Sequence, residues 1–156
     1  MSTKEKTLKT INPTTEEVIK TYNFMSDDES IKAVERCHKA FEQWRHVSLN
    51  DRAKIIKAIG KQLNSKKESL AKLMTEEMGK LIAHGHQEID LCVGICDYTA
   101  KQGKEILKDE ERELGNGGRG IISYAPIGVI YGIQPWNVPA YQVIRFSIAN
   151  LMAGNG

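Results

Sequence analysis

The sequence predicts an α/β fold in which a group of helices precedes the opening strand, turn and helix of a doubly wound parallel sheet. Three observations indicate this fold. From position 26 to about 107, apolar residues recur at helical spacing behind polar capping residues. From Gly115 onward, glycine becomes dense and β-branched residues take over. The run Val129–Ile133 is apolar without interruption, as in parallel strands buried on both faces, and a proline-flanked turn follows it.

Four helices are expected in the first part of the chain. Ser26–Glu29 is a capping box, Ser48–Asp51 opens a second helix, Ser65–Glu68 is another capping box, and a fourth helix covers roughly 85–107. Gly79 stands where a glycine commonly ends a helix. The apolar residues at helical spacing are expected to face the core. They are Ile31, Val34, Phe41, Trp44, Ile55, Ile56, Ile59, Leu63, Leu70, Leu73, Met74, Met78, Ile89, Cys92, Val93 and Cys96.

The second part of the chain is expected to begin with a glycine-rich connector at 115–120 and a short strand at Ile121–Tyr124. After the strand Val129–Ile133 and its turn, Tyr141–Met152 has the apolar spacing of a helix. This order opens a doubly wound sheet, in which ligands bind beyond the carboxyl ends of the strands. A single such unit cannot close a sheet, and Leu151–Gly156 resembles a helix end followed by another strand, so we expect a truncated chain.

Composition and charge exclude several classes of function. Lys and Arg number 22 and Asp and Glu number 20, which gives a net charge of +2, and the two signs are interspersed. No nucleic-acid partner is therefore expected. The first ten residues lack the apolar segment of a signal peptide, and no apolar run reaches the roughly 18–20 residues of a membrane span. We expect a cytoplasmic protein without a membrane partner.

The cysteines and histidines do not indicate a reactive centre. Cys37, Cys92 and Cys96 all lie within helical patterns, so we expect reduced thiols that pack in the core. His84 and His86 precede Cys92 but do not complete a ligand set with it. A partly solvated helix start is the expected structure there, and no metal site is predicted.

The turn after the apolar run contains the chemically most informative residues. Pro135 and Pro139 fix the backbone on either side of Trp136 and Asn137, so the chain must stop and turn before a helix starts. The amide of Asn137 can both donate and accept hydrogen bonds. The residues alone leave two interpretations open: Asn137 caps the following helix, or the rigid turn presents its amide to a ligand.

Most of the chain resembles the N-terminal third of the NAD(P)-dependent aldehyde dehydrogenases. The resemblance rests on four helices, a glycine-rich segment and the stretches ISYAPIGVIYGIQPWNVP and NLMAGN, which contain the pattern PxGxxxxIxPWNxP. Ile11–Thr14 resembles an early strand of that family, with Thr15 where glycine is common, and Val138 replaces the commoner Phe. The motifs YQxxRF and NLMAGN are most similar to those of bacterial succinate-semialdehyde dehydrogenases.

The resemblance implies a Rossmann-like dinucleotide-binding domain of which only the beginning is present. Residues 1–114 would be its N-terminal helical part, 115–126 a β arm of the oligomerisation region, and 127–156 its first βα unit. The expected cofactor is NAD or NADP, the expected substrate is an aldehyde, most specifically succinate semialdehyde, and a homo-oligomer (dimer or tetramer) is expected for the full-length protein.

The resemblance also assigns roles to individual residues. Asn137 matches the family's oxyanion donor, and the segment Ile133, Gln134, Pro135, Trp136 and Asn137 would lie along the nicotinamide. Arg145 would pair with the distal carboxylate of the substrate, with Tyr141 and Gln142 beside it. If the helix begins near Pro139, Asn137, Tyr141 and Arg145 fall on one side of it.

The nucleophilic cysteine and the general-base glutamate of the family would lie beyond Gly156, so the chain alone is expected to be inactive. Two alternatives remain open at this point. The chain could be a non-catalytic helical and β interaction module, or it could belong to a relative of the same architecture that reduces acyl phosphates.

Overall fold

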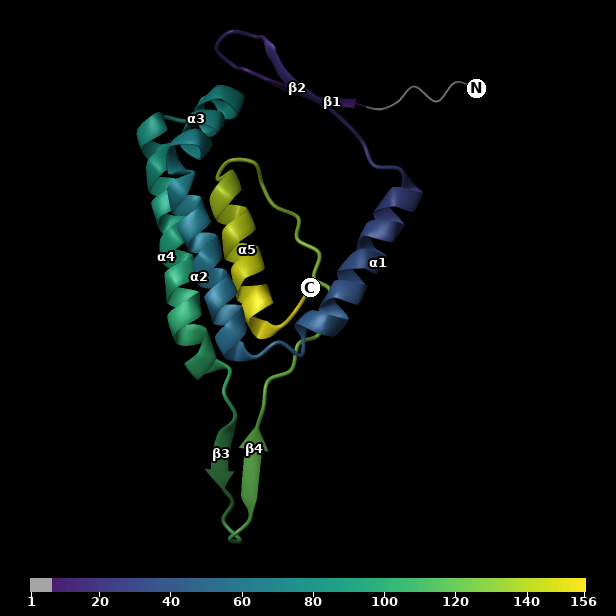
Figure 1. Cartoon of the computed structure of the whole chain (residues 1–156), viewed down its shortest axis with the longest axis vertical. Helices are drawn as coiled ribbons and strands as arrows, with labels where there is room; N and C mark the ends of the chain where they lie inside the picture. Colours follow the sequence, from purple (N-terminus) through teal and green to yellow (C-terminus); the bar gives the residue numbers. More distant parts are fainter. Residues whose placement is uncertain (1–6) are drawn as a thin grey trace.

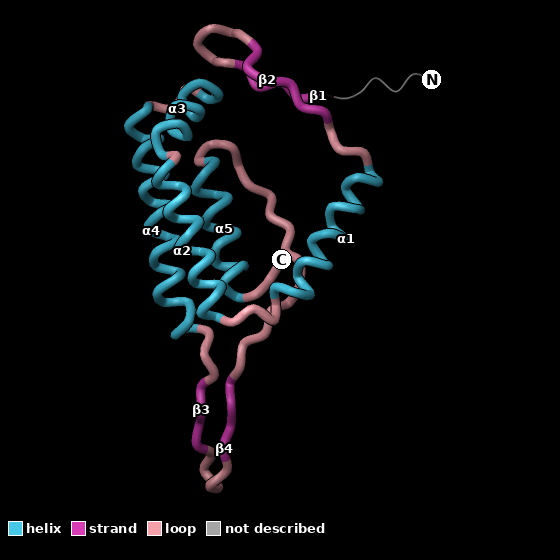
Figure 2. Tube along the Cα trace, in the orientation of Figure 1, coloured by secondary structure: helices cyan, strands magenta, loops and turns pink. Residues whose placement is uncertain are grey.

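The structure is a computed structural model that describes residues 7–156 (Figure 1). Helices α2 to α5 pack together, α1 stands apart from them over most of its length, and a two-stranded hairpin projects at each end of the molecule (Figure 2). The elements in chain order are β1 (Thr7–Ile11), β2 (Val18–Asn23), α1 (Asp27–Trp44), α2 (Leu49–Ser65), α3 (Lys67–Met78), α4 (Ile82–Ile106), β3 (Glu110–Glu113), β4 (Arg119–Ile122) and α5 (Pro139–Ala153).

Helix α4 is the central element, because it packs against α2, α3 and α5. Small residues allow the close approach at each contact. A Cβ added at Gly85 of α4 would lie 3.0 Å from Ala71 of α3, and one added at Gly103 would lie 2.6 Å from Cγ of Met152 on α5. No helix among residues 7–156 has the length and apolar character that crossing a bilayer requires.

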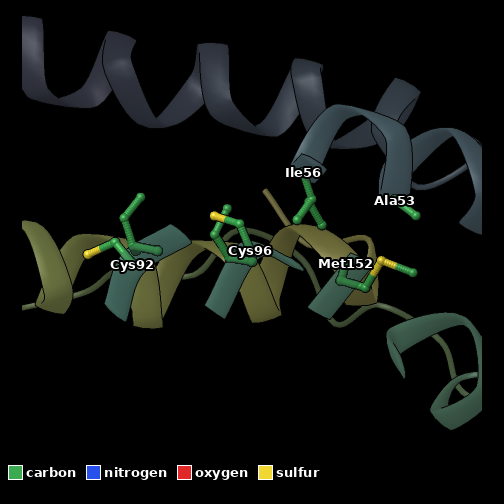
Figure 3. Close-up of a cluster of buried hydrophobic side chains, with 7 residues drawn as sticks. Ala53, Ile56, Cys92, Cys96 and Met152 are labelled. Atoms are coloured by element: carbon green, nitrogen blue, oxygen red, sulfur yellow. The ribbon is translucent and has the colours of Figure 1, made fainter. Parts of the chain in front are cut away.

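The core lies between α2, α4 and α5 (Figure 3). Ile56 of α2, Cys92 and Cys96 of α4 and Met152 of α5 are fully or almost fully buried in it. The predicted packing of Cys92 and Cys96 is therefore confirmed. The same prediction is wrong for Cys37, which is exposed because α1 meets the other helices only near its C-terminal end.

The local start signals of α1 and α2 are confirmed. The Ser26 hydroxyl accepts from the Glu29 N–H at 3.2 Å, and the Glu29 carboxylate accepts from the Ser26 N–H at 2.8 Å. The Ser26 hydroxyl also donates to the Glu29 carboxylate at 3.0 Å, and the two bonds that this carboxylate accepts lower its pKa. Ser48 caps α2 by accepting from the Asp51 N–H at 3.1 Å.

The predicted capping box at Ser65–Glu68 is wrong. Helix α2 continues through Ser65, whose hydroxyl donates to the Gln62 carbonyl at 2.9 Å, and α3 follows after Lys66 without a side-chain cap. The two helices are so closely joined that no residue remains extended to act as a capping serine. Gly79 does end α3, in the left-handed region at φ 69°, as predicted.

Part of the predicted core is exposed in this chain. Ile31 and Val34 of α1 are each 59% exposed, because no other element covers that stretch of the helix. Phe41 and Ile56 are buried as expected, and so are Met74 and Ile89. The exposed members of the predicted set are Ile31, Val34, Ile55 and Leu73.

The bounds of both hairpins differ from those predicted from the sequence. β1 ends at Ile11, and the next residues form a turn in which the Asn12 side chain accepts from the Thr14 N–H at 2.8 Å, so the predicted strand Ile11–Thr14 is mostly a turn. β4 begins at Arg119, inside the predicted connector, and ends at Ile122, before Ser123 and Tyr124. Its partner β3 was not predicted, because its sequence EERE lacks apolar alternation.

The predicted strand Val129–Ile133 is not formed as a strand in the described residues, because only its first residues find a backbone partner, Gly156. The Ile130 N–H donates to the Gly156 carbonyl at 2.8 Å, and the Gly156 N–H donates to the Gly128 carbonyl at 3.1 Å. This is the pattern of a parallel ladder around Val129. The predicted burial on both faces is wrong for this chain: Tyr131 is 87% exposed and Ile133 84%, because no further strand or helix of residues 7–156 covers them.

The close contact between α4 and α5 leads to a prediction about stability. We expect Gly103→Ala to lower the free energy of unfolding by about 1–3 kcal/mol, because the new methyl group would overlap Cγ of Met152. Gly94→Ala is the matched control in the same helix. An added Cβ there has no neighbour within 4 Å, so better helix propensity should raise stability by up to about 1 kcal/mol.

Urea unfolding of both variants distinguishes the two effects. An equal change in the free energy of unfolding for Gly103→Ala and Gly94→Ala would contradict the tight packing of α4 on α5.

Candidate functional site

The turn that precedes α5 presents its side chains outward. Helix α5 begins with Pro139 at its first position, and Val138 is its N-cap residue without a side-chain capping bond. Asn137 therefore lies one residue before the cap, and the interpretation that Asn137 caps the helix is wrong. Asn137 is exposed, as are Trp136 at 78% and Ile133 at 84%. The amide of Asn137 is accessible at the start of α5.

The first two turns of α5 bring the predicted substrate residues together. The Arg145 guanidinium lies over the Tyr141 ring, 5.8 Å from its centroid, so these two side chains share one side of the helix as expected. Gln134, Gln142 and Arg145 line a shallow pocket of about 270 Å³. Asn137 does not line that pocket. The other lining residues are Phe146, Ala149 and Asn150.

Phe146 of α5 supports the segment that leads into the turn. A Cβ added at Gly132 would lie 2.6 Å from the Phe146 ring, so only glycine permits this approach. Sequence reasoning did not assign a role to Phe146. Its position next to Arg145 in the motif YQxxRF was the available signal.

Buried Asn155 fixes the backbone at Ile127 and Gly128, where the segment that leads to the turn begins. Its side-chain oxygen accepts from the Ile127 N–H at 2.8 Å and from the Gly128 N–H at 3.2 Å, and Asn155 is only 6% exposed. Gly128 has φ 132°, a value that favours glycine. Asn155 thus ties the residues after α5 to the residues before the turn.

The C-terminal end of α5 is held by a buried arginine from α2. Arg52, 5% exposed, donates from Nη1 to the Met152 carbonyl at 3.1 Å and from Nη2 to the Arg45 carbonyl at 2.8 Å. Burial lowers the pKa of this guanidinium. Its positive charge complements the negative end of the helix dipole. A Cβ added at Gly154 would lie 2.7 Å from Nη1 of Arg52, so this glycine makes room for the guanidinium.

The N-terminal end of α5 is held by a buried glutamate from α4. Glu88, 5% exposed, accepts from the Tyr141 N–H through Oε1 at 3.0 Å, and its other oxygen pairs with Lys80. A negative charge is favourable at this end of a helix. Sequence reasoning missed Glu88 and Lys80. The available signal was that Glu88 precedes Cys92 by four residues and so shares its apolar face of α4.

The cysteines of the core are not suited to nucleophilic chemistry. Burial raises the pKa of Cys92 to about 12 and that of Cys96 to about 11, so both remain protonated thiols near neutral pH. No group of three His, Cys, Asp or Glu side chains within residues 7–156 is arranged to hold a metal ion. His86 instead lies 2.9 Å from the Glu68 carboxylate.

A family model and the sequences of known proteins both match this chain. The model of the "Aldehyde dehydrogenase family" matches residues 1–156. A succinate-semialdehyde dehydrogenase (NADP+) of Deinococcus radiodurans is 35% identical over 151 residues, which are 97% of this chain and 31% of the relative. A succinate semialdehyde dehydrogenase (NAD(P)+) of Escherichia coli is 34% identical over 146 residues, or 94% of this chain and 31% of the relative.

Solved structures of similar proteins confirm the predicted fold class. A succinic semialdehyde dehydrogenase from Streptococcus pyogenes in complex with NADP+ superposes with a TM-score of 0.88 at 33% identity, over 94% of this chain and 32% of that one. A betaine aldehyde dehydrogenase from Staphylococcus aureus in complex with NAD+ gives 0.88 at 26% identity, over 96% and 30%.

The chain spans about a third of the length of these relatives. Over 94–96% of its length, the chain follows the fold of the solved structures. Together with the family match over residues 1–156, this shows that the chain belongs to the aldehyde dehydrogenase family.

Proposed function

We propose that this chain forms the N-terminal part of an enzyme that oxidises an aldehyde to the carboxylic acid with NAD or NADP, and that the aldehyde is succinate semialdehyde. The observation that carries the proposal is the accessible amide of Asn137 directly before α5, with Arg145 further along the same helix. The names of the Deinococcus and Escherichia relatives support both the cofactor class and the substrate.

The segment before α5 fits a dinucleotide. It follows a segment whose two backbone hydrogen bonds with Gly156 have the pattern of a parallel pairing, and doubly wound sheets bind their ligands beyond the carboxyl ends of such segments. Ile133 and Trp136 leave an exposed apolar surface there, which suits a planar nicotinamide ring. When bound, NAD or NADP supplies the hydride acceptor.

Asn137 would act on the carbonyl oxygen of the aldehyde. Attack by a cysteine thiolate outside residues 1–156 places negative charge on this oxygen, and a positioned amide N–H donor stabilises that charge as it develops. Attack gives a hemithioacetal, and loss of its hydride to NAD(P)+ would leave an acyl thioester. Water activated by a glutamate outside this chain would then hydrolyse the thioester to the carboxylic acid and free the thiol. The role of this chain is to hold the donor at a fixed place, and the prolines on both sides of Asn137 restrict the turn.

Arg145 would recognise the distal carboxylate of the substrate. Its guanidinium is exposed, rests on the Tyr141 ring and shares a pocket with the amides of Gln134 and Gln142, so a carboxylate there would meet several donors. Arg145 lies six residues beyond Pro139, the first residue of α5, or about 9 Å along the helix axis at ~1.5 Å per residue, and Asn137 precedes Pro139 by two residues. The long arginine side chain can shorten this span. We propose that a four-carbon substrate spans the distance between Asn137 and Arg145.

We also propose that the full-length protein is a homo-oligomer in the cytoplasm, assembled through the arm that contains β4. Ile121 is 66% and Ile122 45% exposed in this two-stranded hairpin, and an open strand edge favours pairing with another chain. Sedimentation velocity should show a dimer or a tetramer. A strictly monomeric full-length protein would rule out this assembly.

The role of Asn137 can be tested by Asn137→Asp in the full-length protein. The change keeps the shape of the side chain but replaces the N–H donor with a negative charge, so we expect kcat to fall roughly 10²- to 10³-fold. The measurement is the initial rate of NAD(P)H formation. Asn50→Asp, at an exposed position in the first turn of α2, is the matched control and should leave kcat unchanged. Activity of Asn137→Asp within a few-fold of wild type would remove Asn137 from the site.

The role of Arg145 can be tested with two aldehydes of equal carbon number. A charge-assisted bond of about 1.5–3 kcal/mol should give succinate semialdehyde a kcat/KM about 10- to 150-fold above that of butyraldehyde. Arg145→Ala should remove most of this preference while changing butyraldehyde turnover little. Arg145→Lys should restore the preference only in part, because the planar fork is lost.

Arg36→Ala, at an exposed position of α1, is the control and should keep the preference. Equal kcat/KM values for the two aldehydes in the wild type would overturn the assignment of succinate semialdehyde and leave the general aldehyde oxidation standing.

A further inference from the structure

We propose that Glu88, held by Lys80, is a positioning residue that fixes the place of Asn137 from a different helix. This inference rests on the proposed function, because it assigns Glu88 a role in the geometry of the same site. Glu88 would not touch the substrate or the cofactor. It would act through the first turn of α5.

The first turn of α5 lacks a local cap. Its N-cap residue, Val138, has no side-chain capping bond, and Pro139 has no N–H. The Gln142 N–H already donates to the Val138 carbonyl at 3.0 Å. The N–H groups of Ala140 and Tyr141 are therefore the ones that need an outside partner, and Glu88 accepts from Tyr141 at 3.0 Å.

Glu88 is itself held in one orientation. Its side chain is 3% exposed and that of Lys80 is 12% exposed, so both charges of the pair are withdrawn from water. One carboxylate oxygen faces Lys80 and the other faces the Tyr141 N–H. A buried carboxylate is costly unless both oxygens find such partners, which restricts Glu88 to this arrangement.

Lys80 is fixed by the loop between α3 and α4. Gly79 reverses the chain at φ 69°, and the Thr75 hydroxyl donates to the Lys80 carbonyl at 2.8 Å. The backbone of Lys80 is thus tied to α3 while its ammonium reaches Glu88 on α4. A continuous set of contacts runs from the end of α3 through Lys80 and Glu88 to the start of α5.

Tyr141 is only four residues beyond Asn137. Pro139 lies between the two and Pro135 precedes Asn137, so the backbone of this connection has little conformational freedom. A shift of the first turn of α5 would therefore be passed on to the Asn137 amide. A displacement of about 1 Å at a reacting group can cost ~10²-fold in rate. The ion pair of Glu88 and Lys80 can therefore matter for the rate even if it contributes little to the free energy of unfolding.

The test uses the full-length enzyme and a charge-free replacement, Lys80→Met with Glu88→Leu, which leaves no unpaired buried charge. We expect kcat to fall about 10- to 100-fold, with the Kd of NAD(P)+ within about threefold of wild type. Glu88→Gln keeps an oxygen that can accept from the Tyr141 N–H, so it should retain more of the rate. Lys67→Met with Asp90→Asn removes an exposed ion pair between α3 and α4 that does not reach α5, and it should leave kcat unchanged.

Combination with Asn137→Asp separates positioning from a general loss of structure. If Glu88 acts through Asn137, the Lys80 and Glu88 replacements should add little to the loss already caused by Asn137→Asp. The inference would be overturned if the fold-losses in kcat of the Lys80 and Glu88 replacements and of Asn137→Asp multiplied fully in the combined variant. It would also be overturned if Lys80→Met with Glu88→Leu kept the wild-type kcat. A wild-type enzyme that oxidises no aldehyde would instead overturn the proposed function, so the two failures can be told apart.

Discussion

The candidate site depends on the way α5 is fixed at both ends by buried charges from other helices. Glu88 of α4 accepts from the first turn of α5, and Arg52 of α2 donates to the carbonyl of Met152 in its last turn. Each charge has the sign that the helix dipole favours at that end. Because α2 and α4 also form the core with α5, the position of this helix is set by both packing and directed hydrogen bonds.

This arrangement also places the segments on either side of α5. Asn155, just beyond the helix, binds the backbone of Ile127 and Gly128, and Gly156 pairs with Ile130. Phe146 lies against Gly132, where a side chain would not fit. The segment before α5 is therefore joined by hydrogen bonds and packing to α5 and to the residues after it, while the turn with Asn137 stays exposed, as do Tyr131 and Ile133.

Local signals explain what could be predicted from the sequence. The capping box at Ser26, the cap at Ser48 and the helix end at Gly79 involve residues within a few positions of one another, and all three are present. The PWN turn and Arg145 were found through a family motif, and Tyr141 and Arg145 do share one side of α5. The core around Ile56, Cys92 and Cys96 followed from helical spacing.

The features that sequence reasoning missed depend on distant parts of the chain. Arg52 precedes Ile56 by four residues and Glu88 precedes Cys92 by four, so each shares the apolar face of its helix, but a charged residue there is usually solvated. The packing of α5 against α2 and α4 explains why both are buried. Ser65 has the pattern of a cap, but α2 continues through it. Ile31, Val34 and Ile133 have the pattern of buried residues, yet residues 7–156 contain nothing that covers them.

The most direct test of this account is a crystal structure of the full-length protein with NAD(P)+ and a bound substrate aldehyde. We expect the Asn137 amide nitrogen to lie about 2.7–3.1 Å from the aldehyde oxygen, with the Glu88 carboxylate still accepting from the Tyr141 N–H. An Asn137 amide that points away from the aldehyde oxygen, with another donor in its place, would contradict the central claim that α5 and its preceding turn hold the oxyanion donor.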